Sequence, residues 1–424
     1  MPASSPFPIF RGFEASEAVS ILKPSDAKQT AEAVAWAAAE GGSLEIVAGG
    51  TKRALGRPVK TDHVLDVSQL AGIVAYEPAE LVLTARPGEP LASIKAMLEK
   101  SRQMLAFEPP DWRALLRAEG AETLGGVIAC NLAGSRRVRA GSARDYVLGF
   151  SAVNGFGDIW KAGGKVVKNV TGYDMCKLQA GAYGTLSALT ELTLKVMPRP
   201  ETACTIVLHG LRDEAAIEML ARALNSPFEV SGAAHLPAAS ARRSKVGAVA
   251  AGPGAATALR LEGPRPSVAY RAGALEALVG RSAPLDETET EAFWQEVGGV
   301  QPLLGPGSRI VWRLCPTPSH APAVTRGILA ALPSAEFYFD WGGGLIWLSL
   351  DATEAGADGG ARVVRPAVKS AGGHATLIVA PDAVRASTPV FEPQSATLAE
   401  LTARVKSGFD PRGILNPGRM YEGR

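Results

Sequence analysis

The sequence predicts an α+β fold made of more than one domain, and three observations support this prediction. The chain has 424 residues, which is too long for one ordinary domain. Helical and strand patterns alternate through the first 200 residues, and the prolines at 198 and 200 then interrupt them. Residues 201 to 390 are rich in alanine and mix both patterns more weakly, which is typical of a second α+β unit.

The first part of the chain is predicted to be helix, strand, glycine loop and strand. Residues 25–40 have apolar side chains at helical spacing, with Ser25 or Asp26 as the N-cap and Gly41 at the end. The segment SLEIVAGG that follows is a short strand leading into glycines, and HVLDVSQL is a second strand. A strand therefore delivers the chain directly into the first glycine loop.

Residues 81–200 continue the alternation. A strand, a Pro/Gly turn and an amphipathic helix occupy residues 81–100, and a second glycine-rich loop occupies residues 123–142. The segments YVLGFSAVN, DIWKA and TLSALTELTLKVMP are predicted strands, the last one stopped by Pro198 and Pro200.

Fewer elements can be predicted beyond residue 200. Strands are expected at 203–208, 309–314 and 345–350, and helices at 213–224, 323–331 and 396–407. The chain ends in FDPRGILNPGRMY. We therefore expect a first domain at 1–200 with subdomains at about 15–80 and 81–200, a second at 201–390, and a C-terminal segment at 391–424.

Composition and cysteine spacing exclude several classes of protein. A formal net charge of +2 gives no global field for nucleic acid or anionic lipid. The four cysteines are far apart, with no CxxC pair, which favours a reducing, cytoplasmic compartment. With no basic leader and no apolar run of about 18 residues, the chain is expected to be neither exported nor membrane-spanning.

Three glycine-rich segments are the candidate binding elements. AGGTKRALG, residues 48–56, follows a strand and exposes backbone N–H groups that suit a pyrophosphate, although a plain turn explains it equally well. It matches neither GxGxxG nor GxxxxGK[ST], which argues against a Rossmann or Walker site. TLGGVIACNLAGSRRVRAG, residues 123–141, allows close backbone approach to a planar ligand, and tight turns are the alternative. The turn at Gly181–Leu186 could present amides to a nucleotide.

The three segments in this order resemble the FAD-binding domain of the vanillyl-alcohol oxidase and p-cresol methylhydroxylase (PCMH) superfamily. The resemblance implies a PCMH-type domain of two α+β subdomains, a second α+β domain, and a C-terminal segment that returns to the flavin. In that family the first loop wraps the pyrophosphate and the second lines the flavin. The FAD-binding residues implied here are Ala48, Gly49, Gly50, Thr51, Lys52, Thr123, Leu124, Gly125, Gly126, Asn131, Gly134, Gly141, Gly184, Thr185, Leu186 and Asn416.

Longer phrases resemble the FAD-binding subunits of bacterial glycolate oxidases, among them LAGSRR, GSARDYVLG, GGKVVKNVTGYD, AYGTL and DWGGGLIWL. This resemblance implies oxidation of glycolate or D-lactate within a complex that has a second flavin subunit and an iron-sulfur subunit. Any contact with the inner face of the cell membrane is expected through those partners. The alternatives are an electron-transfer or assembly subunit whose flavin never meets substrate, and a stand-alone FAD-dependent alcohol oxidase.

The sequence departs from the catalytic members of this branch. It lacks their H-x-G-D-G-N-x-H segment, and its five histidines lie far apart, so no metal site is expected. No histidine suits covalent flavin attachment, which predicts non-covalent FAD.

No catalytic residue can be assigned from the sequence. Oxidation of a 2-hydroxy acid needs a base near the hydroxyl and a cation for the carboxylate. Lys168 and Tyr173 are candidates to face the flavin, but a solvated lysine and a packed tyrosine are the more common alternatives. The Arg136, Arg137 and Arg139 cluster could neutralise phosphates, contact an acidic substrate or form a solvated face, which is slightly favoured. Trp341 is expected in a turn before a buried strand, with a pocket wall as the alternative.

Overall fold

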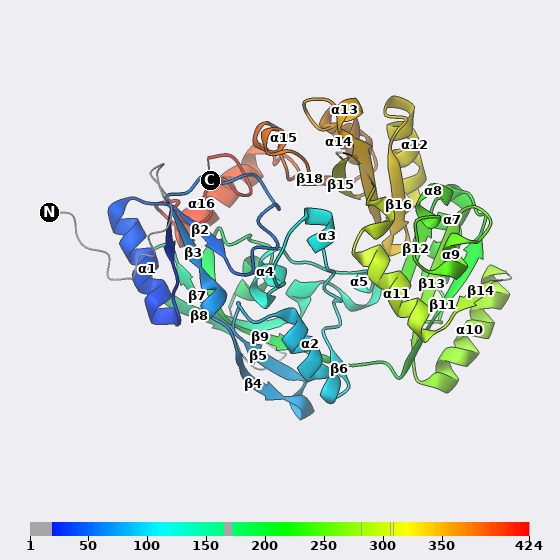
Figure 1. Cartoon of the computed structure of the whole chain (residues 1–424), viewed down its shortest axis with the longest axis horizontal. Coiled ribbons are helices and arrows are strands. Elements are labelled where there is room, and N and C mark those ends of the chain that lie inside the picture. The colour runs from blue at the N-terminus through cyan, green and yellow to red at the C-terminus, as the bar shows by residue number, and fades with distance from the viewer. Residues whose placement is uncertain (1–18, 165–171, 281, 306, 308, 424) are drawn as a thin grey trace.

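The computed structural model describes residues 19–164, 172–280, 282–305, 307 and 309–423. Helices pack on β-sheets in two successive parts of the chain, which confirms the predicted α+β class (Figure 1). Residues 20–198 form a three-stranded, a five-stranded and a small two-stranded sheet, and residues 202–379 form one sheet of eight strands. The switch to the large sheet therefore follows the prolines at 198 and 200. Lys168 lies outside the described residues.

The first sheet is parallel and has the strand order β1-β3-β2. Its members are β1 (Ser20–Leu22), β2 (Leu44–Val47) and β3 (His63–Asp66), with helix α1 (Ala27–Glu40) between β1 and β2. Asp26 caps α1 by accepting a 2.8 Å hydrogen bond from the Gln29 amide, and Gly41 ends the helix in a left-handed conformation. These bounds confirm the predicted helix, its Asp26 cap and both strands.

The second sheet is antiparallel, in the order β4-β5-β9-β7-β8. Its strands are β4 (Ile73–Glu77), β5 (Val82–Ala85), β7 (Val147–Asn154), β8 (Ile159–Gly163) and β9 (Ser187–Lys195). Helix α2 (Leu91–Lys100) buries Leu91, Ile94 and Leu98. The last predicted strand corresponds to β9 and ends at Lys195, before the prolines. Pro198 lies instead in the two-residue strand β10 (Met197–Pro198), which pairs with β6 (Gln103–Met104).

The glycine-rich region 123–142 contains two short helices where the sequence suggested loops. They are α4 (Leu124–Ala129) and α5 (Arg137–Ala140). Gly125 lies inside α4, where a Cβ atom would come within 2.6 Å of the Pro87 Cβ. The absence of a side chain at Gly125 therefore lets α4 pack against the loop that contains Pro87. The short helices α3 (Arg113–Leu116) and α6 (Met175–Gln179) lie in the same half of the chain.

The eight-stranded sheet is antiparallel throughout, in the order β14-β11-β13-β12-β16-β17-β15-β18. Its strands are β11 (Thr202–His209), β12 (Gly232–Leu236), β13 (Ala256–Gly263), β14 (Ala283–Leu285), β15 (Arg309–Cys315), β16 (Glu336–Asp340), β17 (Leu345–Asp351) and β18 (His374–Val379). Its longer helices are α7 (Asp213–Leu224), α10 (Arg265–Val279), α11 (Glu287–Gly298), α12 (Ala321–Ala331) and α14 (Ala361–Ser370). The shorter ones are α8 (Ala238–Ala241), α9 (Gly247–Ala250), α13 (Ala352–Ala355) and α15 (Asp382–Ser387). The predicted strands correspond to β11, β15 and β17, and the predicted helices to α7 and α12.

The C-terminal segment returns to the first sheet. Helix α16 (Ala396–Phe409), drawn in red in Figure 1, ends beside the second sheet, where the Phe409 carbonyl accepts a 2.8 Å hydrogen bond from the Gly155 amide. Beyond it, Leu415 forms a parallel bridge with Leu44, and the Asn416 amide donates to the Leu44 carbonyl at 2.9 Å. The terminal LNPG segment is therefore an extra edge beside β2, as the predicted fold requires.

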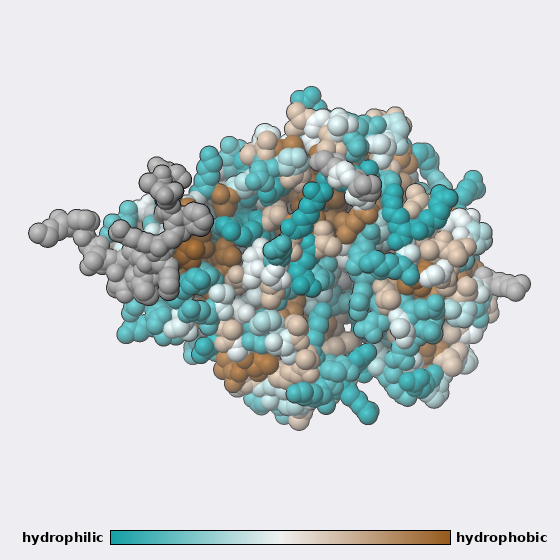
Figure 2. Space-filling model, in the orientation of Figure 1, coloured by the Kyte–Doolittle hydropathy of each residue, from teal (hydrophilic) through white to brown (hydrophobic). Residues whose placement is uncertain are grey.

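The surface carries its apolar residues in separate patches rather than in one band, on the face shown in Figure 2. Among the helices of the described residues, none is long and apolar enough to cross a membrane.

Candidate functional site

A cavity opens where the first sheet, helix α4 and the C-terminal segment meet. Its lining comes from residues 46–53, from parts of segments 123–130 and 179–189, and from Val67, Pro87, Asn416 and Arg419. The three glycine-rich segments, which are far apart in the sequence, thus converge on one space. Fold and terminal segment together build the candidate site.

The first loop leaves β2 with its backbone exposed to this cavity. A Cβ atom on Gly49 would lie 1.9 Å from the Ala121 carbonyl oxygen, so only glycine permits this contact. Gly50 has φ +73°, and a Cβ there would meet nothing closer than the Arg53 Cδ at 4.0 Å. A bare backbone turn of this kind offers N–H groups to an anion.

Three cations line the same cavity, and two carboxylates position them. The Lys52 ammonium is paired with Glu122, and both side chains are largely buried. Arg53 and Arg419 both bind Glu45, the latter at 2.8 Å. Burial alone would raise the pKa of Glu45, but the two guanidinium groups lower it overall. The cations are thus fixed in place beside the loop, where they favour a bound anion.

Asn416 links the terminal segment to the other two sides of the cavity. Its Oδ1 accepts a 2.9 Å hydrogen bond from the Ile46 amide, and its Nδ2 donates to the Tyr183 carbonyl at 2.7 Å. A Cβ atom on Gly184 would lie 2.6 Å from that Nδ2, so the turn needs glycine there. Lys406 reinforces the junction by donating to the Thr185 carbonyl at 2.6 Å.

Unpartnered polar atoms at the cavity show that it suits a polar ligand. Gln179 is 4% exposed; its Oε1 accepts from Ser187 at 2.8 Å, while its Nε2 has no partner. The buried Nε of Arg419 also lacks one. FAD has pyrophosphate oxygens, ring nitrogens and carbonyl groups that accept such hydrogen bonds. The glycine-lined cradle, the fixed cations and these donors therefore fit FAD.

Ten of the sixteen residues expected to bind FAD line this cavity. They are Ala48, Gly49, Gly50, Thr51, Lys52, Thr123, Gly125, Gly126, Gly184 and Asn416. The other six, Leu124, Asn131, Gly134, Gly141, Thr185 and Leu186, are absent from its lining.

Packing and turn geometry explain the residue type at four of these six positions. Leu124 is fully buried in the core. Asn131 has φ +48° and accepts a 2.9 Å hydrogen bond from the Arg144 amide. A Cβ on Gly134 would lie 2.5 Å from the Glu108 carbonyl oxygen, and one on Gly141 would lie 2.8 Å from Asp145 Oδ2. Each has a structural reason for its residue type that does not involve a ligand.

The remaining two residues, Thr185 and Leu186, stabilise the turn at Gly184. Thr185 donates a hydrogen bond from its hydroxyl to the Ala182 carbonyl at 2.7 Å, and Leu186 is buried.

The sequence analysis missed other residues that line the cavity, including Cys130, Gln179, Tyr183 and Arg419. Arg419 follows the LNPG segment directly and could have been found from it. Gln179 and Cys130 carry no such signal.

Among the described residues no histidine lines the cavity, but Cys130 does. Burial raises the pKa of the Cys130 thiol to about 11. The thiol is therefore protonated at neutral pH and is a poor nucleophile toward a flavin. Within the described residues no group of three or more His, Cys, Asp or Glu side chains is placed to hold a metal ion.

The arginine cluster is largely buried between the two halves, so the favoured solvated-face interpretation is wrong for Arg136 and Arg137 and right for Arg139. Arg139 is exposed and pairs with Glu229. Arg136 instead forms a 3.2 Å ion pair with Glu262 of β13. Arg137 is half-buried, with its guanidinium 4.6 Å from the centre of the Trp341 ring.

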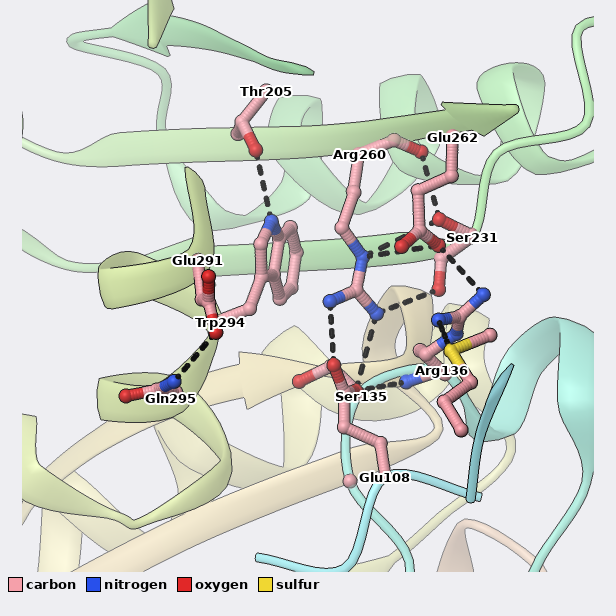
Figure 3. Close-up of polar contacts among 12 residues, drawn as sticks. Glu108, Ser135, Arg136, Thr205, Ser231, Arg260, Glu262, Glu291, Trp294 and Gln295 are labelled. Carbon is pink, nitrogen blue, oxygen red and sulfur yellow. Dashed lines mark hydrogen bonds and ion pairs between the residues drawn. The ribbon is translucent and has the colours of Figure 1, made fainter. Parts of the chain in front are cut away.

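The network around Arg136 joins the two halves of the chain (Figure 3). Glu108, in the loop after β6, accepts a 2.7 Å hydrogen bond from Arg260 of β13 and a 2.9 Å bond from the Arg136 amide. The Arg260 guanidinium lies 4.8 Å from the Trp294 ring centre. Although burial raises the pKa of Glu108, Arg260 and Arg136 lower it overall. Ion pairs among Glu108, Arg136, Arg260 and Glu262 thus hold the large sheet against the first half.

Trp341 agrees with its prediction, whereas Tyr173 does not. Trp341 begins the predicted turn, the 3₁₀ turn Trp341–Gly343 between β16 and β17, and it also lines a small cavity, which agrees with its alternative interpretation. Tyr173 is 89% exposed and is therefore neither packed nor part of the cavity lining.

Comparison with known proteins identifies the family. Residues 19–163 match the family described as an FAD binding domain. The chain is 38% identical over 381 residues to the glycolate oxidase subunit GlcE of Escherichia coli strain K12, covering 89% of this chain and 92% of that subunit. The chain belongs to the GlcE family of glycolate oxidase subunits. It thus has an FAD-binding domain, in agreement with the cavity.

Relatives outside the GlcE family match over shorter stretches. The glycolate oxidase subunit GlcD of Bacillus subtilis strain 168 is 36% identical over 151 residues, covering 35% of this chain and 30% of that subunit. A D-lactate dehydrogenase of Anaerostipes hadrus is 34% identical over 145 residues, covering 34% of this chain and 29% of that enzyme.

Solved structures share the fold over nearly the whole chain. p-Cresol methylhydroxylase with bound substrate aligns with a TM-score of 0.67 at 13% identity, covering 94% of this chain and 88% of that one. The 4-ethylphenol oxidase from Gulosibacter chungangensis gives 0.67 at 12% identity, covering 95% and 89%. The chain therefore has the PCMH-type α+β fold that the sequence predicted.

Proposed function

We propose that this chain is the FAD-holding subunit of a glycolate oxidase complex, which oxidises glycolate or D-lactate to the 2-oxo acid. The observation that carries the proposal is the convergence of three glycine-rich segments and the terminal Asn416 on one cavity, in a chain that matches a glycolate oxidase subunit almost end to end. When bound, FAD would supply the acceptor for a hydride from the substrate.

The proposal assigns separate tasks to the residues of the cavity. The backbone of Gly49 and Gly50, with Lys52 and Arg419, would hold the pyrophosphate. Helix α4 and the turn at Tyr183–Gly184 would enclose the rest of the cofactor, and the unpartnered Gln179 Nε2 would donate to one of its acceptors. The ten lining residues predicted from the sequence are proposed to contact FAD, and its attachment is proposed to be non-covalent.

The partners and location follow from the same proposal. A second flavin subunit and an iron-sulfur subunit would complete the complex, and electrons would leave through them. The complex would work in the cytoplasm, with any contact at the inner face of the membrane made by the partners.

The direct test is anaerobic mixing of glycolate with the FAD-loaded chain, alone and in its complex. Bleaching of the flavin absorbance in the complex is expected. Bleaching by the isolated chain would mean that this chain oxidises substrate itself. Failure of glycolate and D-lactate to bleach any flavin in the complex would contradict the proposal.

A second candidate function is electron transfer or assembly without substrate contact. It is favoured by the missing H-x-G-D-G-N-x-H segment and by the lack of a metal-ligating cluster within the described residues. This alternative predicts that flavin in this subunit is reduced only when the second flavin subunit is present and active. The third alternative, a stand-alone alcohol oxidase, instead predicts oxygen consumption by the isolated chain.

A further inference from the structure

A buried arginine of helix α15 holds the segment that follows the first glycine loop. Arg385 is 6% exposed, and its Nη1 donates hydrogen bonds to the Ala54 carbonyl at 2.6 Å and to the Gly56 carbonyl at 2.8 Å. Its Nη2 binds Asp382 of the same helix at 2.6 Å. The guanidinium group is therefore fixed between its own helix and a loop that lies 331 residues earlier in the chain.

The alternate carbonyls of the same stretch accept hydrogen bonds from Arg419. Its Nη1 donates to the Arg53 carbonyl at 2.9 Å and to the Leu55 carbonyl at 3.1 Å. The Arg57 amide in turn donates to the Arg419 carbonyl at 2.8 Å, and a Cβ atom on Gly56 would lie 2.7 Å from that oxygen. Four successive carbonyls therefore accept hydrogen bonds from the two guanidinium groups.

These hydrogen bonds act on the loop that lines the FAD cavity. Arg53 is the last residue of the stretch 46–53 in the cavity lining, and the carbonyls bound by guanidinium groups begin at Arg53. Because a peptide group is planar and trans, fixing a carbonyl also fixes the direction of the N–H group of the next residue. A backbone held in one conformation loses little freedom when its ligand binds, which favours affinity.

Helix α15 is in turn anchored to the large sheet. It follows β18 in the chain, and the segment after it returns to that strand, where the Leu377 amide donates to the Val390 carbonyl at 2.9 Å. Arg57 adds a second contact between α15 and the first half, because its Nη2 donates to the Ala386 carbonyl at 2.8 Å. Figure 1 shows α15, in orange, between the large sheet and the C-terminus. The helix therefore connects the large sheet to the loop at the FAD cavity.

We propose that Arg385 is a positioning residue for FAD, which together with Arg419 holds the first glycine loop in its FAD-binding conformation and thereby slows release of the cofactor. This inference rests on the proposed placement of FAD in the cavity. Arg385 does not itself line the cavity, so it acts through the loop and not by touching FAD. Without its guanidinium group the Ala54 and Gly56 carbonyls would lose their donor, and the loop would be held less firmly.

The rate of FAD release from the full-length, FAD-loaded chain tests this role. Arg385→Gln should release FAD about 10-fold faster and raise its Kd by a similar factor, since it removes two hydrogen bonds from a charged donor. Arg385→Lys keeps the charge and a donor but loses the planar guanidinium group, so its release rate should lie between the other two. The flavin fluorescence that appears after dilution measures the release.

Arg271→Gln, in helix α10, is the matched control. Arg271 is 8% exposed and also donates to two backbone carbonyls, those of Phe228 at 2.9 Å and Glu262 at 2.7 Å. None of these three residues lines the FAD cavity. The substitution should lower the unfolding temperature of the FAD-free chain to an extent similar to Arg385→Gln, but it should leave the rate of FAD release unchanged. Faster release at equal stability is an effect that general destabilisation does not produce.

Hydrogen exchange of the unsubstituted chain gives a second measurement, which needs no folded variant. If α15 stabilises the loop that holds FAD, then FAD must stabilise the contact with α15, because coupling between two sites is reciprocal. FAD is therefore expected to slow amide exchange in residues 382–387 of α15. Helix α10 is the internal comparison, and its exchange should be the same with and without FAD.

Two results would overturn the inference. One is FAD release from Arg385→Gln that is no faster than release from Arg271→Gln, and the other is exchange in α15 that does not respond to FAD. Both measurements proceed without substrate, so their failure leaves the proposed oxidation of glycolate untouched. A chain that binds no FAD, or a complex whose flavin glycolate never reduces, would instead contradict the proposed function.

Discussion

The Nδ2 of Asn416 donates a 2.7 Å hydrogen bond to the backbone carbonyl of Tyr183, which joins the end of the chain to the wall of the FAD cavity. Its Oδ1 simultaneously accepts from the Ile46 amide at 2.9 Å. Asn416 is 3% exposed and has φ +43°, a conformation that asparagine tolerates better than most residues. One buried amide therefore sets the spacing between the first loop, the Gly184 turn and the terminus.

Replacing Asn416 with alanine should weaken both folding and FAD binding. Two buried backbone groups would lose their partners, which predicts a loss of about 2 kcal/mol in the free energy of unfolding. Urea unfolding and FAD titration measure the two effects. Asn225→Ala is the control, because Asn225 is exposed and bonds only to the Ala221 carbonyl of its own helix. Equal effects of the two substitutions would contradict the structural role of Asn416.

Gly125→Ala tests the close packing of α4. A Cβ at Gly125 would come within 2.6 Å of the Pro87 Cβ, so we expect a loss of about 1–3 kcal/mol in unfolding free energy and weaker FAD binding. Gly408→Ala, within helix α16, is the matched control because a Cβ there meets nothing within 4 Å. It should be neutral or stabilise by up to about 1 kcal/mol. Full FAD affinity and unchanged stability in Gly125→Ala would show that the contact is not tight.

Gln179 is predicted to donate a hydrogen bond to FAD. Gln179→Glu keeps the acceptor for Ser187 but replaces the unpartnered Nε2 with an oxygen, and should raise the Kd for FAD about 10-fold. Gln179→Met, which adds no charge, should raise it less. Fluorescence titration with FAD measures the Kd. Gln394→Glu, at a glutamine that bonds to Thr402 and lies outside the cavity lining, should leave it unchanged. An unaltered Kd in both Gln179 variants would refute the contact.

Asp340 should make stability depend on pH. Its carboxylate is buried and accepts hydrogen bonds from the Ser135 hydroxyl at 2.6 Å and the Trp341 amide at 2.7 Å, but burial raises its pKa from 3.8 to about 7. The folded chain thus holds a proton that the unfolded chain releases, so stability from this group falls as pH rises from 3.8 to about 7.

Asp340→Asn removes this dependence. Relative to the unsubstituted protein, the variant should gain unfolding free energy as pH rises, by as much as about 4 kcal/mol over the full range. Urea unfolding at about pH 4.5 and about pH 8 measures the difference. A constant difference between the two proteins would mean that the pKa of Asp340 is the same in the folded and unfolded states.

The sequence predicted the elements whose pattern is local. Helix α1 with its Asp26 cap, the strands β2 and β3, and helix α16 all depend on side-chain periodicity and on Gly or Asp at their ends. Strand β12 was missed because GAAHL has little strand character. It is held by its neighbours, and its Gly232 lies under the Trp294 ring, where a Cβ would be 2.9 Å from the indole.

The candidate site was predictable to a similar extent. Gly49 and Gly125 could be found because a Cβ atom there would clash with Ala121 and Pro87, and Gly50 because its φ of +73° favours glycine. Gln179 could not, because its importance lies in a hydrogen-bond donor that only the folded chain leaves unpaired. The division at residue 200, where the chain enters the large sheet, stays a prediction until the two parts are expressed separately.

The central claim is that this chain holds FAD without a covalent bond. The most direct measurement is the visible spectrum of the purified protein before and after denaturation, with the supernatant separated from the precipitated chain. The account predicts a flavin spectrum in the native protein and full release of FAD into the supernatant. A colourless protein that cannot be reconstituted with FAD, or flavin that stays with the denatured chain, would contradict it.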